Sequence, residues 1–259
     1  MRNNEILDHL WSLHQNPELG VDPTGNDFAR LDLPIKEGQN LQLALLKRWL
    51  ESGETLGGWK IGMTSGASRN AMGPGVRPFG FILKSRIKTQ ADSLSVATLC
   101  RGQIENEVCF CLGKSLSGEA TAADAKAAVA AVLPAFEVNQ KRLPPGASPG
   151  LRVADNLSNW GIVIGASSQP PRSIDDFDQL EVTIGNTQGI IERVASMGHI
   201  DNHFESLATL ARTLAQHGQT LQSGHMVITG AYGKTAFAPG NYYGDFGKQL
   251  GRVEVGLTA

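Results

Sequence analysis

From about Leu56 onward, short apolar segments recur along the chain, each bounded by glycine or turn residues. Such segments are typical of β-strands. Four examples are GGWKIGMTS, FGFILKSRIK, GQIENEVCFCLG and NWGIVIG. The 30 glycines fit the many tight turns that short strands require. We therefore predict that residues 56–259 form a β-rich core.

The first 55 residues have a different, helical pattern. Apolar residues between Ile6 and Leu13 recur with helical spacing, and the run LQLALLKRWL, Leu41–Leu50, predicts a second helix that ends near Gly53. Residues 16–38 contain prolines and glycines without periodicity, so they predict a connection that could act as a lid over a site. We expect residues 1–55 to join the β-rich core in one structural unit.

Two further helices interrupt the predicted strands. Thr121 followed by Asp124 resembles a capping box, and the alanine-rich run after it predicts a helix that continues to Leu133 and ends at Pro134. A second helix is expected around residues 203–217, because leucines recur on one of its faces. The segments GHMVITG and RVEVGL then predict strands near the end of the chain.

Composition excludes several classes of partner. A formal net charge of -2 does not provide the basic surface that nucleic acid or an anionic membrane requires. The chain has neither the apolar core of a signal peptide nor a run of about 20 apolar residues that could span a membrane. Three cysteines, Cys100, Cys109 and Cys111, are an odd count that argues for reduced thiols. We expect a cytoplasmic protein.

The segment IENEVCFCLG places two carboxylates on one side of a strand. Alternate residues of a strand share a face, so Glu105 and Glu107 project together, with Cα atoms roughly 6–7 Å apart. Like charges that face one spot repel each other unless a cation, protons or water intervene. A bare E-x-E pattern is nevertheless more common on a solvent-exposed strand edge, so this pair alone does not establish a site.

Glu137 supplies a third carboxylate. It lies between apolar residues in AFEVNQKR, and the connection from Glu107 includes a helix long enough to return this segment beside the first strand. Three carboxylates could then converge on one cation. Oxygen ligands completed by water and a chelating substrate suit Mg²⁺ or Mn²⁺ better than zinc, which prefers nitrogen and sulfur.

Lys60 is a candidate catalytic residue in GGWKIGMTS, because a partly buried lysine can neutralise an oxyanion or move a proton. The alternative is a surface lysine whose stem covers apolar area. His199 and His203 have the H-x-x-x-H spacing of a zinc pair, but Gly198 argues for a later helix start and Ile200 occupies the position of the glutamate of HExxH. We therefore do not predict a zinc site.

Taken together, five segments resemble the fumarylacetoacetate hydrolase superfamily, within it the 2-keto-4-pentenoate hydratase and 4-oxalocrotonate decarboxylase branch. They are GWKIGMTS, IENEVCFCLG, LPAFEVNQKR, VADNLSNWGIVIG, and SGHMVITGAY with GDFGKQLGRVEVG. The resemblance implies an α+β fold, a mixed β-roll with N-terminal helices. It also implies Mg²⁺ or Mn²⁺ on Glu105, Glu107 and Glu137, with Lys60 and Ser158 near the substrate, and a homo-oligomer.

The sequence departs from that family pattern at positions that bear on the substrate. Pro78-Phe79-Gly80 lacks the acidic residue that such hydratases often place between proline and glycine, and Arg77 precedes it. Asn139 replaces an acidic residue, and Lys234 lies in a segment that is generally neutral in the family. We predict that Arg77 and Lys234 bind the substrate, through an extra carboxylate on its tail.

The resemblance implies chemistry on a small 2-oxo or 2-hydroxydienoic acid. Such an acid can chelate the metal, which would stabilise an enolate, with Lys60 balancing negative charge and Ser158 orienting substrate or water. The first hypothesis is a hydratase of 2-hydroxypenta-2,4-dienoate-like acids. A 4-oxalocrotonate-type decarboxylase is the second and a C–C hydrolase of acylpyruvates the third. The alternative from another class is a non-catalytic partner of such an enzyme, against which the intact set of carboxylates argues.

Overall fold

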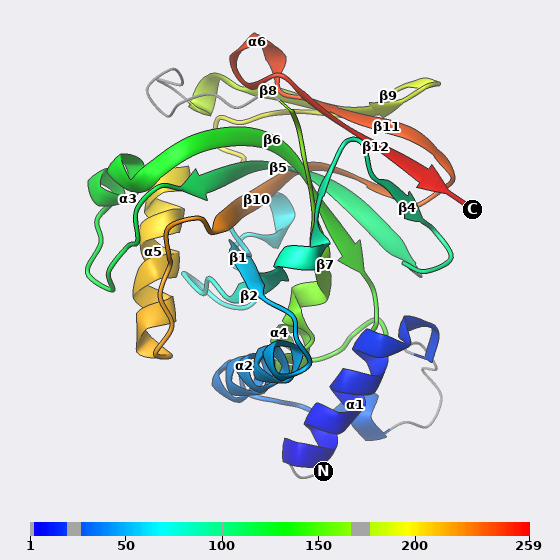
Figure 1. Cartoon of the computed structure of the whole chain (residues 1–259), viewed down its shortest axis with the longest axis vertical. Helices are drawn as coiled ribbons and strands as arrows, with labels where there is room; N and C mark the ends of the chain where they lie inside the picture. The colour runs from blue at the N-terminus through cyan, green and yellow to red at the C-terminus, as the bar shows by residue number, and fades with distance from the viewer. Residues whose placement is uncertain (1–2, 20–26, 100, 167–176) are drawn as a thin grey trace.

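The computed structural model describes residues 3–19, 27–99, 101–166 and 177–259, which form two β-sheets flanked by helices (Figure 1). The larger sheet has seven strands in the order β2-β1-β10-β5-β6-β7-β3. Their bounds are β1 Leu56–Ile61, β2 Phe79–Leu83, β3 Ile87–Thr89, β5 Gly102–Leu112, β6 Val129–Gln140, β7 Asn159–Ile164 and β10 Met226–Ala236.

A second, five-stranded sheet has the order β4-β12-β11-β8-β9. Its strands are β4 Ser93–Ser95, β8 Glu181–Asn186, β9 Gly189–Ala195, β11 Gly240–Asp245 and β12 Arg252–Thr258. The main apolar core joins residues of β5 and β6, including Val108 and Phe136, to residues of this second sheet, including Val182 and Val253. Burying these apolar faces against each other gives the mixed β-roll its stability.

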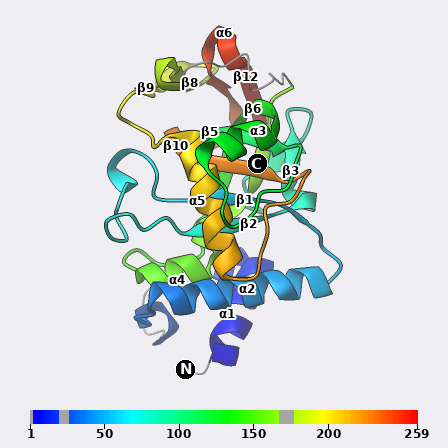
Figure 2. The same cartoon turned by 90° about the vertical axis from the view of Figure 1, so that its left-hand side faces the viewer.

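The helices surround the sheets (Figure 1), and α1, α2 and α4 lie at the end of the molecule opposite the five-stranded sheet (Figures 1 and 2). Their bounds are α1 Asn3–Gln15, α2 Ile35–Glu51, α3 Ala122–Ala128, α4 Pro149–Ala154, α5 His203–Gln216 and α6 Gly247–Leu250. Helices α2 and α4 approach closely, because a Cβ atom on Gly38 would stand 2.0 Å from the carbonyl oxygen of Gly150. Glycine at position 38 therefore permits α2 to pack directly against α4.

Most predicted elements are confirmed, including the α+β class and the N-terminal helix. Helix α5, at His203–Gln216, corresponds to the helix predicted around residues 203–217. The Thr121 capping box is present, because the Thr121 side chain accepts from the Asp124 amide and the Asp124 carboxylate accepts from the Thr121 amide. FGFILKSRIK forms two strands, β2 and β3, separated by a single turn.

Two predicted boundaries are wrong. The helix after Thr121 ends at Ala128 rather than Leu133, and Val129 begins β6, in which Pro134 lies opposite Val108 of β5. Long-range pairing with β5 thus overrides the helical propensity of the alanines. Helix α2 begins at Ile35, directly after Pro34, and not at Leu41. Proline next to a helix start is favourable, because it does not leave an unpaired amide there.

Only part of the connection predicted at residues 16–38 belongs to the described residues. Residues 20–26 lie outside the described residues, and the remainder contains single turns at Pro17–Leu19 and Asp27–Arg30 before α2 begins. None of the described residues of this connection lines the cavity discussed below. The lid therefore stays a prediction.

None of the helices among the described residues is both long enough and apolar enough to cross a membrane. Cys109 and Cys111 are free thiols, as expected, and Cys109 is buried. Cys100 lies outside the described residues.

Candidate metal centre and active site

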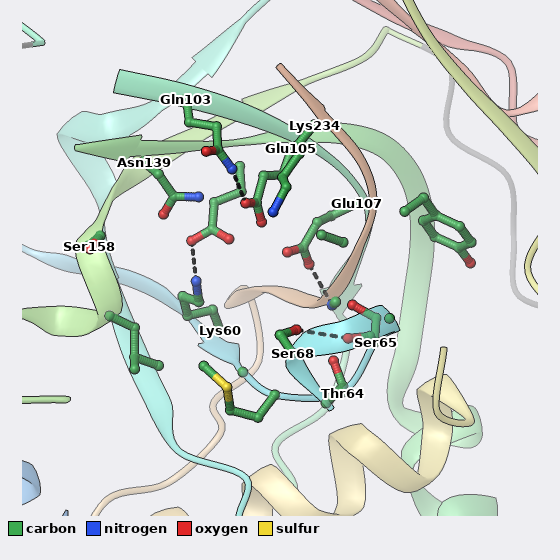
Figure 3. Close-up of a pocket in the computed structure, with 18 of the residues that line it drawn as sticks. Lys60, Thr64, Ser65, Ser68, Gln103, Glu105, Glu107, Asn139, Ser158 and Lys234 are labelled. Atoms are coloured by element: carbon green, nitrogen blue, oxygen red, sulfur yellow. Dashed lines mark hydrogen bonds and ion pairs between the residues drawn. The ribbon is translucent and has the colours of Figure 1, made fainter. Parts of the chain in front are cut away.

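A cavity of about 510 Å³ opens on the face of the seven-stranded sheet that points away from the five-stranded sheet, and it contains the predicted carboxylates. Its walls come from β1 and the loop after it, from β5, β6 and β10, and from α4 and the turn that follows it (Figure 3), and Glu192 of β9 also lines it. Residues far apart in the sequence meet here, because β1, β10, β5 and β6 are neighbours in the sheet.

The strand register brings the three glutamates together. Glu105 of β5 lies opposite Glu137 of β6, and Glu107 follows two residues later on the same face of β5. One carboxylate oxygen from each lies within 4.8 Å of those from the other two. Glu107 and Glu137 are 3% and 1% exposed, so water screens their mutual repulsion poorly.

Each of these carboxylates is oriented by a donor on one of its oxygens. The Gly230 amide donates to Glu107 Oε2 at 2.6 Å, and Asn159 Nδ2 donates to Glu137 Oε1 at 2.8 Å. The ammonium of Lys60 donates to that same oxygen of Glu137, and Gln103 Nε2 donates to Glu105 Oε1. Within the described part of the chain, the second oxygen of each carboxylate accepts no hydrogen bond. Donors that fix one oxygen and leave the other free are characteristic of carboxylates around a metal ion.

The electrostatics of the cluster also favour a cation. Burial raises the pKa of Glu107 well above its usual value and that of Glu105 to a lesser degree, and the charge of Glu137 adds to both shifts. Burial alone would lower the pKa of Lys60, but Glu137, Glu107 and Glu105 raise it above its usual value, so this lysine stays an ammonium. One ammonium does not neutralise three carboxylates.

The donor set fits a hard divalent ion. All the candidate ligand atoms are oxygens, which Mg²⁺, Mn²⁺ and Ca²⁺ prefer. The buried Oδ1 of Asn139, which also lines the cavity, has no hydrogen-bond partner among the described residues and offers a further acceptor for a ligand or its water. Among those residues, this is also the only group of three or more potential metal ligands that are close enough to share an ion.

The two histidines considered for zinc are engaged elsewhere. His199 lies before α5, and its Nε2 is 3.1 Å from the carbonyl oxygen of Ala231. His203 begins α5, and its ring nitrogens lie 2.7 Å from Thr229 Oγ1 and 2.9 Å from the Tyr232 hydroxyl. The two imidazoles therefore do not form the i, i+4 pair on one helix that a zinc motif requires.

Ser158 lies at the cavity wall at the end of an unusual turn (Figure 3). Asn156, Leu157 and Ser158 all have left-handed backbones, with φ values of 57°, 52° and 64°. Such residues other than glycine are energetically unfavourable and need support from their surroundings. The buried Asn156 side chain supplies it, because its Oδ1 accepts from the Phe81 amide at 2.7 Å and its Nδ2 donates to the Phe81 carbonyl at 2.9 Å.

A buried chain of contacts connects the cluster to the N-terminal helix. Asn159, which donates to Glu137, accepts on its carbonyl from Arg142 Nη2 at 3.3 Å. Arg142 Nε donates to Asp155 Oδ1 at 2.7 Å, and His14 Nε2 of α1 lies 3.1 Å from the same oxygen. Sequence reasoning missed this support, because nothing in the spacing of these residues indicates that they touch.

The structure brings most of the predicted site residues together, but not all. Lys60, Ser158 and Lys234 line the cavity with the carboxylates, and Lys234 lies opposite Glu105 in the β5–β10 pairing. Arg77 is not among the lining residues, because its guanidinium makes an ion pair with Asp201 at 2.8 Å. The lining cations that the sequence did not indicate are Lys141 and Arg152.

Known proteins that are similar to this chain include hydratases and a decarboxylase. No protein-family model matches the chain. It is 31% identical over 187 residues to a 2-keto-4-pentenoate hydratase from Paraburkholderia phymatum, with 70% of each chain covered. It is also 29% identical over 210 residues to a 4-oxalocrotonate decarboxylase from Pseudomonas sp, with 80% of this chain and 79% of that protein covered.

Solved structures show the same fold. The 4-oxalocrotonate decarboxylase from Pseudomonas putida G7, complexed with magnesium and adipate, matches with a TM-score of 0.85 and 24% identity over 100% of this chain and 99% of that one. A putative fumarylacetoacetate hydrolase family protein from Yersinia pestis CO92 matches with a TM-score of 0.58 and 13% identity, covering 79% of this chain and 94% of that one.

Fold and site together define an enzyme with the fumarylacetoacetate hydrolase fold. The chain belongs to the 2-keto-4-pentenoate hydratase family, and it has the fold of a solved 4-oxalocrotonate decarboxylase.

Proposed function

We propose that the chain is a divalent-metal-dependent lyase that hydrates 2-hydroxypenta-2,4-dienoate-like acids. The observation that carries the proposal is the convergence of Glu105, Glu107 and Glu137 beside the ammonium of Lys60 in one cavity. The hydratase names of relatives that cover most of the chain support the reaction class. Decarboxylation of a 4-oxalocrotonate-type acid is the second candidate, supported by the relative of that name.

In this proposal Glu105, Glu107 and Glu137 hold Mg²⁺ or Mn²⁺, which supplies Lewis acidity toward a 2-oxo acid when bound. Lys60 stays protonated and balances negative charge that develops on the 2-oxygen or the adjacent carboxylate of the substrate. Its ammonium is fixed for this role by its hydrogen bond to Glu137. Ser158 presents its hydroxyl from the left-handed turn and orients the substrate or the attacking water.

The experiment is an assay of the purified chain with 2-hydroxypenta-2,4-dienoate, before and after removal of divalent ions. We expect loss of the conjugated absorbance that requires Mg²⁺ or Mn²⁺ and releases no CO₂. Metal-dependent release of CO₂ from a 4-oxalocrotonate-type acid would favour the second candidate. Absence of both reactions would reject the lyase and favour a non-catalytic partner.

We also infer that the enzyme is a homo-oligomer. The side chains of Ile190, Ile191 and Met197 are 55%, 43% and 65% exposed, and the first two belong to β9, an edge strand of the five-stranded sheet. Apolar side chains on an exposed strand edge are suited to an interface. Light scattering should give a mass above that of one chain, and Ile190→Asp should reduce it. A monomeric wild-type chain would reject the inference.

A further inference from the structure

We propose that Asn139 binds the oxygen atom that hydration adds at C4 of the substrate, first as the attacking water and then as the hydroxyl of the product. The inference rests on the proposed function, because it takes the addition of water to a 2-oxo acid as the reaction. It gives Asn139 a direct contact with the reacting water, whereas the sequence indicated this residue only as a departure from the family pattern.

The side chain of Asn139 is a buried polar group without a partner. The residue is 8% exposed, and neither its Oδ1 nor its amide nitrogen makes a hydrogen bond with the described residues. Of the buried side-chain atoms without a partner in the described ranges, Asn139 Oδ1 is the only one whose residue lines the cavity. Because a buried amide that pairs with nothing is unfavourable, its place in the cavity wall points to a ligand that pairs with it.

The amides on either side of Asn139 have a different role. Gln103 lies opposite Asn139 in the β5–β6 pairing, and its amide donates to Glu105. Asn159 lies opposite Asn139 in the β6–β7 pairing, and its amide donates to Glu137. Both neighbours therefore orient carboxylates. Asn139 lies between them and orients none, so its amide remains available to a bound molecule.

Ser158 provides a second polar group at the same place. It directly precedes Asn159, the partner of Asn139 on β7, and Figure 3 shows Asn139 and Ser158 on the same side of the carboxylates. Its hydroxyl also makes no hydrogen bond with the part of the chain that the structure describes. An amide and a hydroxyl together offer donors and acceptors, which is what a single bound water requires.

The position of the amide along β6 corresponds to C4 of the substrate. Asn139 lies two residues beyond Glu137 on the same face of the strand, which is roughly 6–7 Å. This offset is comparable with the reach of a 2-oxo acid from its carboxylate and 2-oxygen to a hydroxyl on C4. A substrate held at the glutamates by its first two carbons therefore brings C4 to the amide.

The step itself is a conjugate addition. The water oxygen forms a bond to C4, and the electron pair of the C3=C4 double bond moves toward the 2-oxygen, where Lys60 balances the charge. The water releases one proton to solvent and C3 takes up one, so that one molecule of water is added without an oxidant or a reductant. Asn139 takes no proton, because its amide is neutral. It holds the water with a lone pair directed at C4.

Two acids that differ only in the hydroxyl test this contact: 4-hydroxy-2-oxopentanoate and 2-oxopentanoate. Calorimetric titration of the Mg²⁺-loaded full chain should show that the hydroxy acid binds at least about tenfold more tightly, because the other acid leaves the buried amide unpaired. In Asn139→Leu, which has a similar size but no hydrogen-bonding group, the ratio of the two Kd values should fall to about twofold or less. Asn139→Ala, which adds no apolar bulk, should lose the preference as well.

The matched control is Asn241→Leu, which replaces an exposed asparagine outside the cavity and should retain the wild-type ratio. A kinetic measurement separates the contact from general damage to the site. With 2-hydroxypenta-2,4-dienoate, Asn139→Leu should still consume the conjugated dienol, but NMR should show that the unsaturated 2-oxo acid accumulates and that the 4-hydroxy acid forms at least about tenfold more slowly. An equal slowing of both steps would contradict the inference.

The remaining outcomes separate the inference from the proposed function. Equal affinity of the wild-type chain for both acids, or an unchanged ratio in Asn139→Leu, would overturn the role of Asn139 and leave the lyase standing. Weaker Mg²⁺ binding in Asn139→Leu with the ratio retained would place the amide at a water of the metal ion and would also overturn it. If neither acid bound in a Mg²⁺-dependent manner and the wild-type chain formed no hydroxy acid, the proposed function would fail, and the inference with it.

Discussion

The two faces of strands β5 and β6 differ sharply, although they belong to the same stretches of sequence. On one face Val108, Phe110 and Phe136 are fully buried in the core shared with the five-stranded sheet. On the other face Glu105, Glu107 and Glu137 crowd their carboxylates together at the cavity. Because side chains alternate along a strand, each of these two strands stabilises the fold through its apolar face and destabilises it through the repulsion between carboxylates on its other face.

The comparison shows how the fold can tolerate the repulsion among the three glutamates. Three carboxylates that are largely removed from water repel one another, which costs stability unless a cation binds. The apolar face offsets this cost, because each large side chain buried there stabilises the fold by about 2–3 kcal/mol. The two faces should therefore respond to substitution in opposite ways.

The largest effect is expected from Glu107→Gln on the acidic face. The substitution removes a ligand charge, so kcat/KM should fall about a thousandfold, equivalent to about 4 kcal/mol, and Mg²⁺ binding should weaken in parallel. Stability without metal should not decrease, since the raised pKa of Glu107 reflects an unfavourable charge. Kinetics, metal titration and urea unfolding measure the three quantities. The control is Glu119→Gln, an exposed carboxylate outside the cavity; turnover unchanged in Glu107→Gln would contradict the assignment.

The next effect concerns the apolar face. Phe136→Ala should lower the free energy of unfolding by about 3–5 kcal/mol, because it leaves a cavity in the main core. Urea unfolding of the metal-free chain tests this, with Glu107→Gln as the matched change on the other face. A loss below about 1 kcal/mol would mean that the apolar face does not carry the stability attributed to it.

A third expectation concerns pH and His203, which packs 5.6 Å from the Phe110 ring on the apolar face. Burial lowers the pKa of His203 to about 3, so the imidazole stays neutral in the folded protein. The unfolded chain takes up a proton below about pH 6.5, so stability is full above that pH and decreases as the pH falls. Between pH 6.5 and 5 the loss should be about 2 kcal/mol.

The variant His203→Gln isolates this share of the pH dependence. Its unfolding free energy should change less between pH 6.5 and 5 than that of the wild-type chain, when both are measured by urea unfolding. His14, whose pKa burial lowers to about 4, contributes in the same direction and remains in the variant. Identical slopes for the two proteins would show that His203 is not the neutral buried group described here.

The smallest effect on Mg²⁺ affinity should come from Asn159, which orients a carboxylate of the acidic face by a hydrogen bond. Asn159→Ala removes one of the two donors to Glu137 Oε1 and leaves Lys60 as the other, so it should weaken Mg²⁺ binding about tenfold, because groups that orient metal ligands typically contribute this much. Isothermal titration with Mg²⁺ measures the change. A matched Asn241→Ala, on β11 and outside the cavity, should leave the affinity unaltered. Equal affinities in all three proteins would remove Asn159 from the support.

The sequence was most informative where local pattern and tertiary structure agree. The alternation in IENEVCFCLG predicted that Glu105 and Glu107 share a face, and the register of β5 with β6 shows that they do. The capping box at Thr121 likewise marked the start of α3. Neither prediction depended on knowing the neighbouring elements.

The sequence was less informative where distant segments decide the outcome. The alanines after Asp124 favour a helix locally, but pairing with β5 turns the second half of that run into β6. The sequence also did not indicate which cations line the cavity. Arg77 pairs with Asp201 outside it, whereas Arg152 of α4 lines it. Such choices depend on contacts between residues that are far apart in the sequence.

Helix α1 contributes no residue to the cavity, but the contact between His14 and Asp155 connects it to the metal centre. A chain truncated just after α1 would expose the Asp155–Arg142 pair, whose side chains are now fully shielded, to solvent. If Arg142 became mobile, Asn159, which accepts from it, would hold the carboxylate of Glu137 less firmly. Removal of α1 should therefore weaken metal binding even when the two sheets remain folded. Helix α1 thus stabilises the metal centre from outside the cavity.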